Sequence, residues 1–89
     1  VSRSGINRVM LKIRVKSGPQ VVFSPRGIGM THETKWFFVV LCELWRQRRD
    51  SNGWLEVKNE ELQRLSSINR TGVWRVRRLL VKAGLIEEG

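Results

Sequence analysis

The clearest pattern in the chain is an alternation of apolar and polar residues over residues 9–16. The apolar positions, spaced two apart, are Val9, Leu11, Ile13 and Val15. A period of two places them on one face of an extended chain, so it predicts a half-buried β-strand. Ser17-Gly18-Pro19 is a turn sequence, and we expect residues 20–23 to return as the second strand of an N-terminal β-hairpin.

Residues 31–49 predict a long helix, with Thr31 as its N-cap and Asn52-Gly53 as its stop. At about 100° per residue the helix has two apolar faces. The first contains Trp36, Phe37, Val40, Leu41 and Leu44, and the second contains Phe38, Cys42 and Trp45. Both must be covered, so we expect the C-terminal helices on the first face. The N-terminal hairpin or the partner of a homodimer would cover the second.

The remaining residues predict a short strand, two helices and a final strand. Residues 54–57 read as the short strand, Asn59 as the cap of the second helix, and Asn69 as the cap of a third helix that runs to about Ala83. Gly84 stops that helix, and a strand begins after it. The central core is expected to contain Phe37, Val40, Leu41, Leu44, Leu62, Leu65, Ile68, Val73, Val76 and Leu80.

The predicted order of helix, strand, helix, short turn, helix and strand contains a helix-turn-helix. Four stretches are Leu62-Gln-Arg-Leu65, Ser67-Ile-Asn-Arg-Thr-Gly-Val73, Arg77-Arg-Leu-Leu80 and Ala83-Gly-Leu-Ile86. In this order they resemble the winged-helix domains of bacterial and phage regulators and replication initiators. The resemblance covers roughly residues 31–88. It implies an α+β winged helix-turn-helix domain at 30–89, with the hairpin and loop at 1–29 packed on it as one compact unit.

Two features depart from the resemblance. Arg77 stands where the family usually buries a leucine, and the sequence ends at Gly89 before a second wing strand returns. Because the chain also begins at Val1 without an initiator methionine, we expect it to be a fragment of a longer protein, and the wing is incomplete unless that parent sequence supplies the missing strand.

The distribution of charge along the sequence indicates which class of binding partner to expect. The formal net charge is +9, and neither residues 1–30 nor the span from Arg64 to Lys82 contains an Asp or Glu. Unneutralised blocks of this kind favour a polyanionic partner, nucleic acid by default, and a solubilising surface is the alternative.

The third helix carries most candidate binding residues. Its predicted buried arc contains Val73, Val76, Leu79, Leu80 and Ala83, its exposed arc contains Arg70, Thr71, Trp74, Arg75, Arg78, Val81 and Lys82, and Arg77 lies on the border. We expect the first turn, with Asn69, Arg70 and Thr71, to meet base edges. Arg75 and Arg78 would reach guanine or phosphate, and Arg64, Arg77 and Lys82 would contact phosphates.

Two residues of this helix have open interpretations. Trp74 would contact DNA, or would pack with Val81 against the hairpin or another subunit. Gly72 would allow close approach to a duplex, or would serve a tight contact between helices.

The composition favours neither an enzyme nor a metal or cofactor site. The only cysteine, Cys42, lies in an apolar run and the only histidine, His32, has no ligand partner nearby in sequence. The longest apolar run, Trp36 to Cys42, is too short to cross a bilayer. A single buried thiol suggests a reducing, cytoplasmic compartment.

The sequence therefore predicts a duplex-DNA-binding module that reads with the helix Asn69–Ala83, in a transcription regulator. A replication protein or a plasmid or phage maintenance protein with the same fold is the first alternative. A winged helix used for protein–protein interaction, anchored by Trp74 and Val81, is the second. Other domains of the parent protein remain candidate partners, and membrane-surface binding ranks last.

Overall fold

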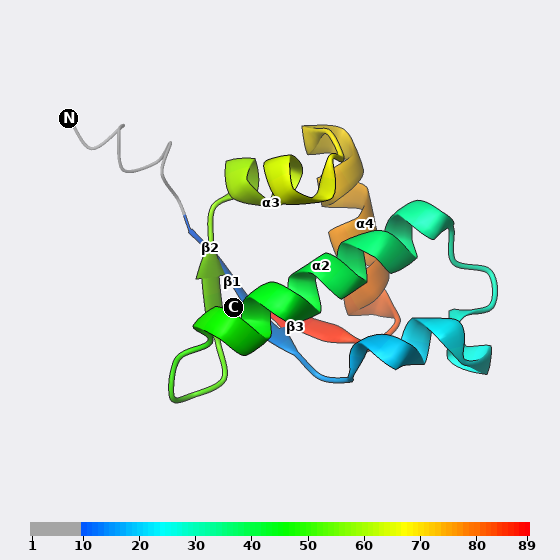
Figure 1. Ribbon diagram of the computed structural model, residues 1–89, viewed down its shortest axis with the longest axis horizontal. Coiled ribbons are helices and arrows are strands. Elements are labelled where there is room, and N and C mark those ends of the chain that lie inside the picture. The colour runs from blue at the N-terminus through cyan, green and yellow to red at the C-terminus, as the bar shows by residue number, and fades with distance from the viewer. Residues whose placement is uncertain (1–9) are drawn as a thin grey trace.

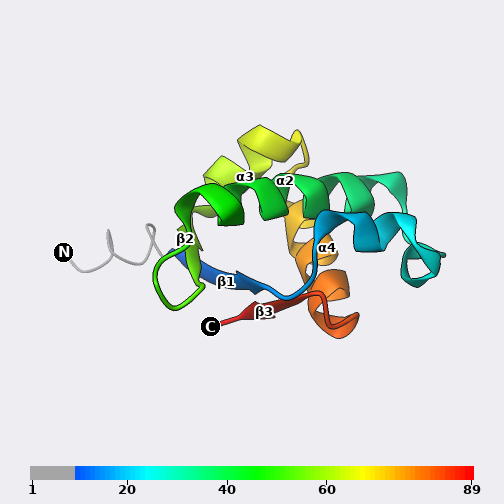
Figure 2. The same ribbon diagram turned by 60° about the horizontal axis from the view of Figure 1, so that its bottom comes forward.

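The computed structural model describes residues 10–89. These residues form an α+β fold of three α-helices, two short 3-10 helices and one antiparallel sheet (Figure 1). In chain order the elements are β1 (Leu11–Val15), η1 (Pro19–Phe23), η2 (Pro25–Gly27), α2 (His32–Arg48), β2 (Leu55–Val57), α3 (Asn59–Ser66), α4 (Arg70–Lys82) and β3 (Ile86–Glu88). The helices α2 and α3 lie together on one side of the sheet, and α4 runs from the end of α3 towards β3 (Figure 2).

β1 is the central strand of the sheet, in the order β2-β1-β3. Ile13 is opposite Leu55 of β2 on one edge and opposite Glu88 of β3 on the other, and both pairings are antiparallel. The alternation seen in the sequence is confirmed here, because Ile13 and Val15 are buried while Lys12 is exposed. Val9, the first residue of the expected strand, lies outside the described residues.

The predicted second strand of an N-terminal hairpin is wrong. Pro19–Phe23 forms the 3-10 helix η1, which begins at its proline and buries Val22. A proline has a fixed φ that suits the first turn of a helix, and it lacks the N–H that a sheet ladder uses. Both edges of β1 are also occupied by β2 and β3, so no edge remains for a strand returning directly from the turn.

Most of both apolar faces of α2 is covered, as the sequence predicts, but Trp36 at the start of the first face is 52 % exposed. Phe37 and Phe38, which point to different sides of the helix, are each fully buried. α2 packs against α3 and α4, and also against η1, β1 and β2, so the N-terminal segment covers the second face without forming a hairpin. Cys42 lies on that second face, and burial raises the pKa of its thiol to about 12. The thiol is therefore protonated and unreactive at neutral pH.

Two of the three predicted helix caps are confirmed. Thr34 N–H donates to the hydroxyl oxygen of Thr31 (3.1 Å), and Gly72 N–H donates to the side-chain oxygen of Asn69 (2.8 Å). The predicted cap at Asn59 is wrong by one position. Lys58 is the N-cap of α3, and no side chain caps that helix. After α4 the chain turns at Gly84, whose φ of +79° is the left-handed conformation that favours glycine.

The predicted core is largely confirmed, with three differences. Leu65 is 41 % exposed and Leu79 is 47 % exposed, although both were expected to face inward, and Val40 is half-buried. Leu62 and Leu80 hold the inward positions of α3 and α4 instead. α3 packs against α2 and α4, and α4 packs against α2, α3 and β3.

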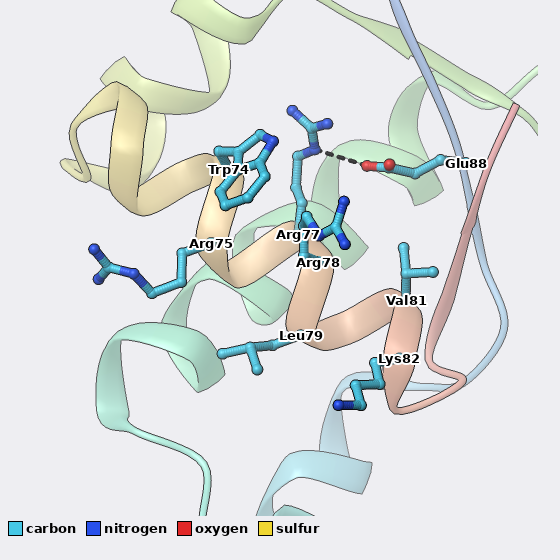
Figure 3. Close-up of a pocket in the computed structure, with 8 residues that line it drawn as sticks. All are labelled: Trp74, Arg75, Arg77, Arg78, Leu79, Val81, Lys82 and Glu88. Carbon is cyan, nitrogen blue, oxygen red and sulfur yellow. Dashed lines mark hydrogen bonds and ion pairs between the residues drawn. The ribbon is translucent and has the colours of Figure 1, made fainter.

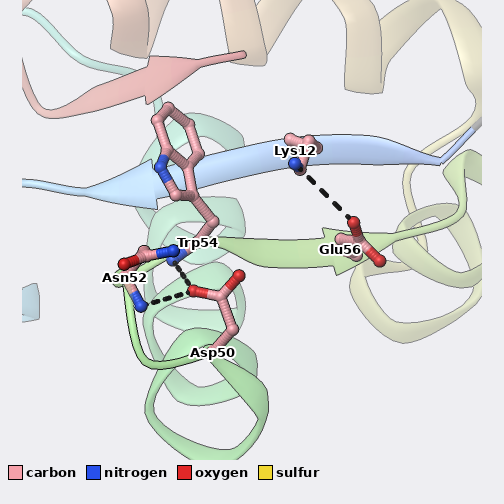
Figure 4. A network of polar contacts seen from close by, with 5 residues as sticks. All are labelled: Lys12, Asp50, Asn52, Trp54 and Glu56. Carbon is pink, nitrogen blue, oxygen red and sulfur yellow. Dashed lines mark hydrogen bonds and ion pairs between the residues drawn. The ribbon is translucent and has the colours of Figure 1, made fainter.

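The turn between α2 and β2 is organised by one carboxylate. Asp50 Oδ1 accepts hydrogen bonds from the backbone N–H groups of Asn52 (2.8 Å) and Trp54 (3.0 Å), as Figure 4 shows. The bond from Trp54 is the main cause that holds the pKa of Asp50 below its usual value, because it stabilises the charged carboxylate. Trp45 Nε1–H of α2 donates to the carbonyl of Gly53 (2.7 Å), which ties this turn to the helix.

Adjacent leucines of α4 offer a direct test of the packing. Leu80 is fully buried, so Leu80→Ala should lower the free energy of unfolding by about 2–5 kcal/mol, the usual cost of a buried leucine truncation. Leu79→Ala, with half of its side chain in solvent, serves as the matched control and should change stability by roughly 0.5 kcal/mol or less. Urea denaturation of both variants measures the difference in unfolding free energy. Equal losses would contradict the orientation of α4 in which Leu80 faces the core and Leu79 faces solvent.

Candidate nucleic-acid interface

α4 is held in place by the three-residue connection from α3, formed by Ser67, Ile68 and Asn69. Ser67 adopts a left-handed conformation (φ 60°) that reverses the chain, and Ile68 then enters the core with only 6 % of its surface exposed. The hydroxyl of Ser66 donates to the carbonyl of Leu62 (2.6 Å) and accepts from the N–H of Ile68 (3.3 Å). The connection is therefore rigid, and it fixes where α4 begins.

α2 supports the same connection from outside. Trp36 Nε1–H donates to the carbonyl of Ser66 (3.0 Å), although the indole ring of Trp36 is half exposed. This bond satisfies a carbonyl at the end of α3 that has no partner within the helix.

Gly72 serves a tight contact with the connection that precedes α4, whereas its two sequence interpretations were close approach to a duplex and a contact between helices. It is buried, and a Cβ placed on it would lie 2.5 Å from Ile68 Cγ2 and 3.1 Å from the side-chain oxygen of Asn69. No side chain fits there without displacing Ile68 from the core. Because Gly72 is covered by its own turn, it does not provide a site for close approach of a ligand.

The first turn of α4 exposes Asn69, Arg70 and Thr71. Asn69 uses its side-chain oxygen to cap the helix, so its amide nitrogen is the part left for a ligand. A carboxylate oxygen of Glu33 lies 3.8 Å from the place that a Cβ of Gly72 would occupy, so one acid of α2 is close to this end of the helix. The positive end of the helix dipole stabilises that carboxylate.

Most predicted binding residues share the exposed surface of α4. A groove of about 630 Å³ runs along this helix (Figure 3). Its lining residues are Trp74, Arg75, Arg77, Arg78, Leu79, Val81, Lys82 and Glu88. Trp74 is 54 % exposed and Val81 is 40 % exposed, so the expected packing of this pair against an N-terminal hairpin does not occur. Below, this surface together with Arg70 and Thr71 is called the α4 surface.

Trp74 and Arg78, one helical turn apart, form a unit within this surface. The guanidinium carbon of Arg78 lies 5.1 Å from the centroid of a Trp74 ring. This distance is within the range of a cation–π contact, which orients the arginine over the ring without neutralising its charge. The α4 surface therefore presents a positive charge on top of an exposed aromatic ring.

Arg77 differs from the other basic residues of α4. Its Nε–H donates to Glu88 Oε2 of β3 (2.7 Å), and only 12 % of its side chain is exposed (Figure 3). From its predicted position at the border of the buried arc, the side chain of Arg77 therefore extends to the sheet and pairs with Glu88. We leave Arg77 out of the surface offered to phosphates.

Arg64 is also separate from the α4 surface. It is exposed near the end of α3, but it lines a different groove, shared with Arg48, Lys58, Glu60 and Glu61. Three carboxylates, including Glu56, lie along that groove, so its positive charge is largely balanced. The predicted phosphate contact of Arg64 stays a prediction, and Arg64 is not part of the α4 surface.

The ion pairs within residues 10–89 explain why the α4 surface is positive. They are Lys12–Glu56, Arg14–Glu87, Arg46–Glu43, Arg48–Glu61 and Arg77–Glu88. Four of these pairs engage bases of the sheet or of α2, and the fifth engages Arg77 of α4 itself. Within the same residues, no carboxylate pairs with Arg70, Arg75, Arg78 or Lys82.

Two residues near α4 were not singled out by the sequence. Arg26 of η2 reaches the end of the helix, where its Nη2–H donates to the carbonyl of Ala83 (3.5 Å). Glu88 enters the groove from β3. No local pattern could identify either, because both contacts join elements that are far apart in the chain.

Other kinds of site have little support in the described part of the molecule. Within residues 10–89 no helix is long and apolar enough to cross a membrane, and no cluster of three or more His, Cys, Asp or Glu could hold a metal ion. Comparisons of the chain with protein-family models, curated proteins and solved structures find no match.

The role of Gly72 predicts an unusual sign for a substitution. Gly→Ala within a helix normally gains about 1 kcal/mol. Here the new methyl group would overlap Ile68, so Gly72→Ala should instead lower the free energy of unfolding by about 1–3 kcal/mol. Thr71→Ala, on the exposed side, is the control and should have an effect of roughly 0.5 kcal/mol or less.

A double variant identifies the cause of the loss. In an Ile68→Ala background the loss of unfolding free energy from Gly72→Ala should disappear, and its persistence would exclude Ile68 as the cause.

Proposed function

We propose that this chain binds duplex DNA, with α4 as the helix that enters the major groove, in the manner of a winged-helix domain. The observation that carries the proposal is the α4 surface, where four basic side chains that have no carboxylate partner within residues 10–89 share one helix with an exposed tryptophan. Basic side chains neutralise phosphates, and a protruding helix fits the width of the major groove.

The arrangement of α3, the short connection and α4 supports a helix-turn-helix reading. α3 and α4 pack on each other and on α2, and the N-terminal residues of α4 are exposed. In a helix-turn-helix those residues meet base edges, so Arg70 and Thr71 are the proposed reading positions and Asn69 contributes its amide nitrogen. Arg75 follows about one turn later and is a further proposed reading position, and Arg78 and Lys82 lie beyond it, where the helix leaves the groove and phosphates are within reach.

The sheet supports a winged-helix-like architecture with one difference in strand order. β3 follows α4 as a first wing strand does, but its partner is β1, which lies between β2 and β3. In this proposal the N-terminal strand β1 pairs with β3, so the described residues give β3 a partner without a second wing strand.

We assign the module to a transcription regulator acting in the cytoplasm. The same interface would serve a replication protein or a plasmid or phage maintenance protein. Selection of bound sequences from random duplexes separates these roles, because a promoter sequence supports the first and an origin sequence supports the second.

A protein-interaction function is the second candidate, and the exposed apolar side chains of α4 favour it. Trp74, Leu79 and Val81 are each at least 40 % exposed on one helix. Aromatic residues beside arginines are typical anchors of protein interfaces. This function requires no attraction to DNA, so the salt experiment below distinguishes it from the first.

Binding to a mixed-sequence duplex should depend strongly on salt. At about −0.9 per neutralised phosphate, log K should fall against log salt with a slope of roughly −1.8 where only Arg78 and Lys82 contact phosphates and roughly −3.6 where all four unpaired bases of α4 do. Lys82→Gln should reduce the magnitude of the slope by about 0.9, whereas Arg46→Gln, which removes the same charge from α2, should leave it unchanged. Titrations monitored by fluorescence anisotropy give the slopes. Binding that does not respond to salt would favour the protein-interaction function, and stronger binding to single-stranded DNA or RNA would reject the duplex.

Base reading should be confined to the start of α4. Once a bound sequence has been selected, Arg70→Ala and Arg75→Ala should each lose about 1–3 kcal/mol of discrimination at particular base pairs. Lys82→Ala should weaken binding to all sequences alike. Competition with single-base-pair variants of the selected duplex measures both effects, and a uniform loss for all three variants would argue against base contacts by this helix.

A further inference from the structure

Glu88 is the only carboxylate among the residues that line the groove of α4. Pairing with β1 fixes its position, because Glu88 is opposite Ile13 and the next backbone N–H, that of Gly89, donates to the carbonyl of Lys12 (2.9 Å). The carboxylate is therefore held against α4 by the sheet.

The contact made by Glu88 changes the charge available on α4. Glu88 Oε2 accepts the Nε–H of Arg77 at 2.7 Å, and the side chain of Arg77 is only 12 % exposed. The adjacent residue, Arg78, is exposed over the ring of Trp74. The charges of these neighbouring arginines thus differ in availability. Arg77 is neutralised by Glu88 of the sheet, whereas Arg78 has no carboxylate partner within residues 10–89.

We infer that Glu88 is a specificity-determining residue that limits non-specific affinity for nucleic acid by withholding the charge of Arg77 from phosphates. This inference rests on the proposed duplex-binding function. Non-specific binding comes almost entirely from cation–phosphate attraction, so each withheld cation lowers it without affecting base contacts. A carboxylate in the groove also repels any phosphate that comes close to it, so it disfavours binding positions that bring a phosphate there.

The pairing assigns Arg77 a different role from the phosphate contact that its sequence position suggested. In the paired state it neutralises Glu88 and neutralises no phosphate. The number of counterions released on binding should then be the same with and without Arg77, whereas removal of Arg78 should reduce that number by about one.

The test compares matched variants on a mixed-sequence duplex over a series of salt concentrations. Glu88→Gln should increase affinity several-fold at low salt and make the slope of log K against log salt more negative by about 0.9, because the freed Arg77 gains a phosphate. Glu61→Gln is the control. Glu61 accepts two hydrogen bonds from Arg48 (2.9 and 3.0 Å) on a different side of the molecule, so the variant breaks a similar pair and makes the same change in net charge. It should leave the slope unchanged.

Two further variants identify the freed charge. Arg77→Gln/Glu88→Gln should return the slope to the wild-type value, and a slope that stays raised would show that Glu88 acts without Arg77 and would overturn the inference. Arg77→Gln alone should keep the wild-type slope while Arg78→Gln reduces its magnitude by about 0.9. This second comparison does not depend on the folding of Glu88→Gln, and circular dichroism confirms that each variant is folded.

The outcomes separate this inference from the function on which it rests. If the wild-type chain does not bind the duplex, the proposed function is rejected. If the wild type binds with the expected slope but Glu88→Gln behaves like Glu61→Gln, only the role of Glu88 is rejected. An equal rise in slope for both variants would reveal a general effect of net charge and would also reject it.

Discussion

β1 pairs along one edge with β2 and along the other with β3, and these two ladders join segments that are far apart in the sequence. The pairing covers the inner side of the sheet with Ile13 and Val15, which are buried beneath α2. It also sets the distance between β3 and α4, because the turn at Gly84 leads directly into a strand whose position β1 dictates. The placement of Glu88 beside Arg77 follows from that register.

α2 is the second element on which the fold depends, and its two apolar faces give it that role. One face supports α3 and α4, and the other rests on the N-terminal segment and the sheet. Burying the large side chains Phe37 and Phe38 on different sides stabilises the fold by roughly 1.5–3 kcal/mol for each. Trp36 adds a polar contact to the end of α3, so the helix that carries the candidate interface is supported from a rigid centre.

The distribution of charge follows from the same arrangement. Carboxylates on the strands and on α2 and α3 lie beside bases of neighbouring elements, where the exposed pairs contribute at most about 1 kcal/mol each to stability. They also leave four bases of α4, namely Arg70, Arg75, Arg78 and Lys82, without a carboxylate partner within residues 10–89. This makes a local concentration of positive charge on that helix, although other bases without ion pairs, such as Lys35 and Lys58, lie elsewhere. The proposed function and the proposed role of Glu88 both depend on this concentration, since the first uses the unpaired bases and the second limits their number.

The local patterns of the sequence were sufficient to predict the three α-helices, the strands around Ile13, Leu55 and Ile86, and most of the exposed arc of α4. Periodicity and capping identified the strand around Ile13, the cap at Asn69, the stop at Gly84 and the exposed arc with Arg75 and Lys82, because each is set by interactions within a few residues. The partners of those elements were decided only by the tertiary structure. The sequence placed η1 beside β1 as a returning strand, turned Leu79 inward and left Arg77 free for phosphate. For η1 and Arg77 a contact with a distant segment determined the outcome: β2 and β3 occupied the edges of β1, and Glu88 reached Arg77 from the sheet. Local periodicity specifies which face of an element is apolar, whereas pairing between distant strands and ions depends on the whole packed chain.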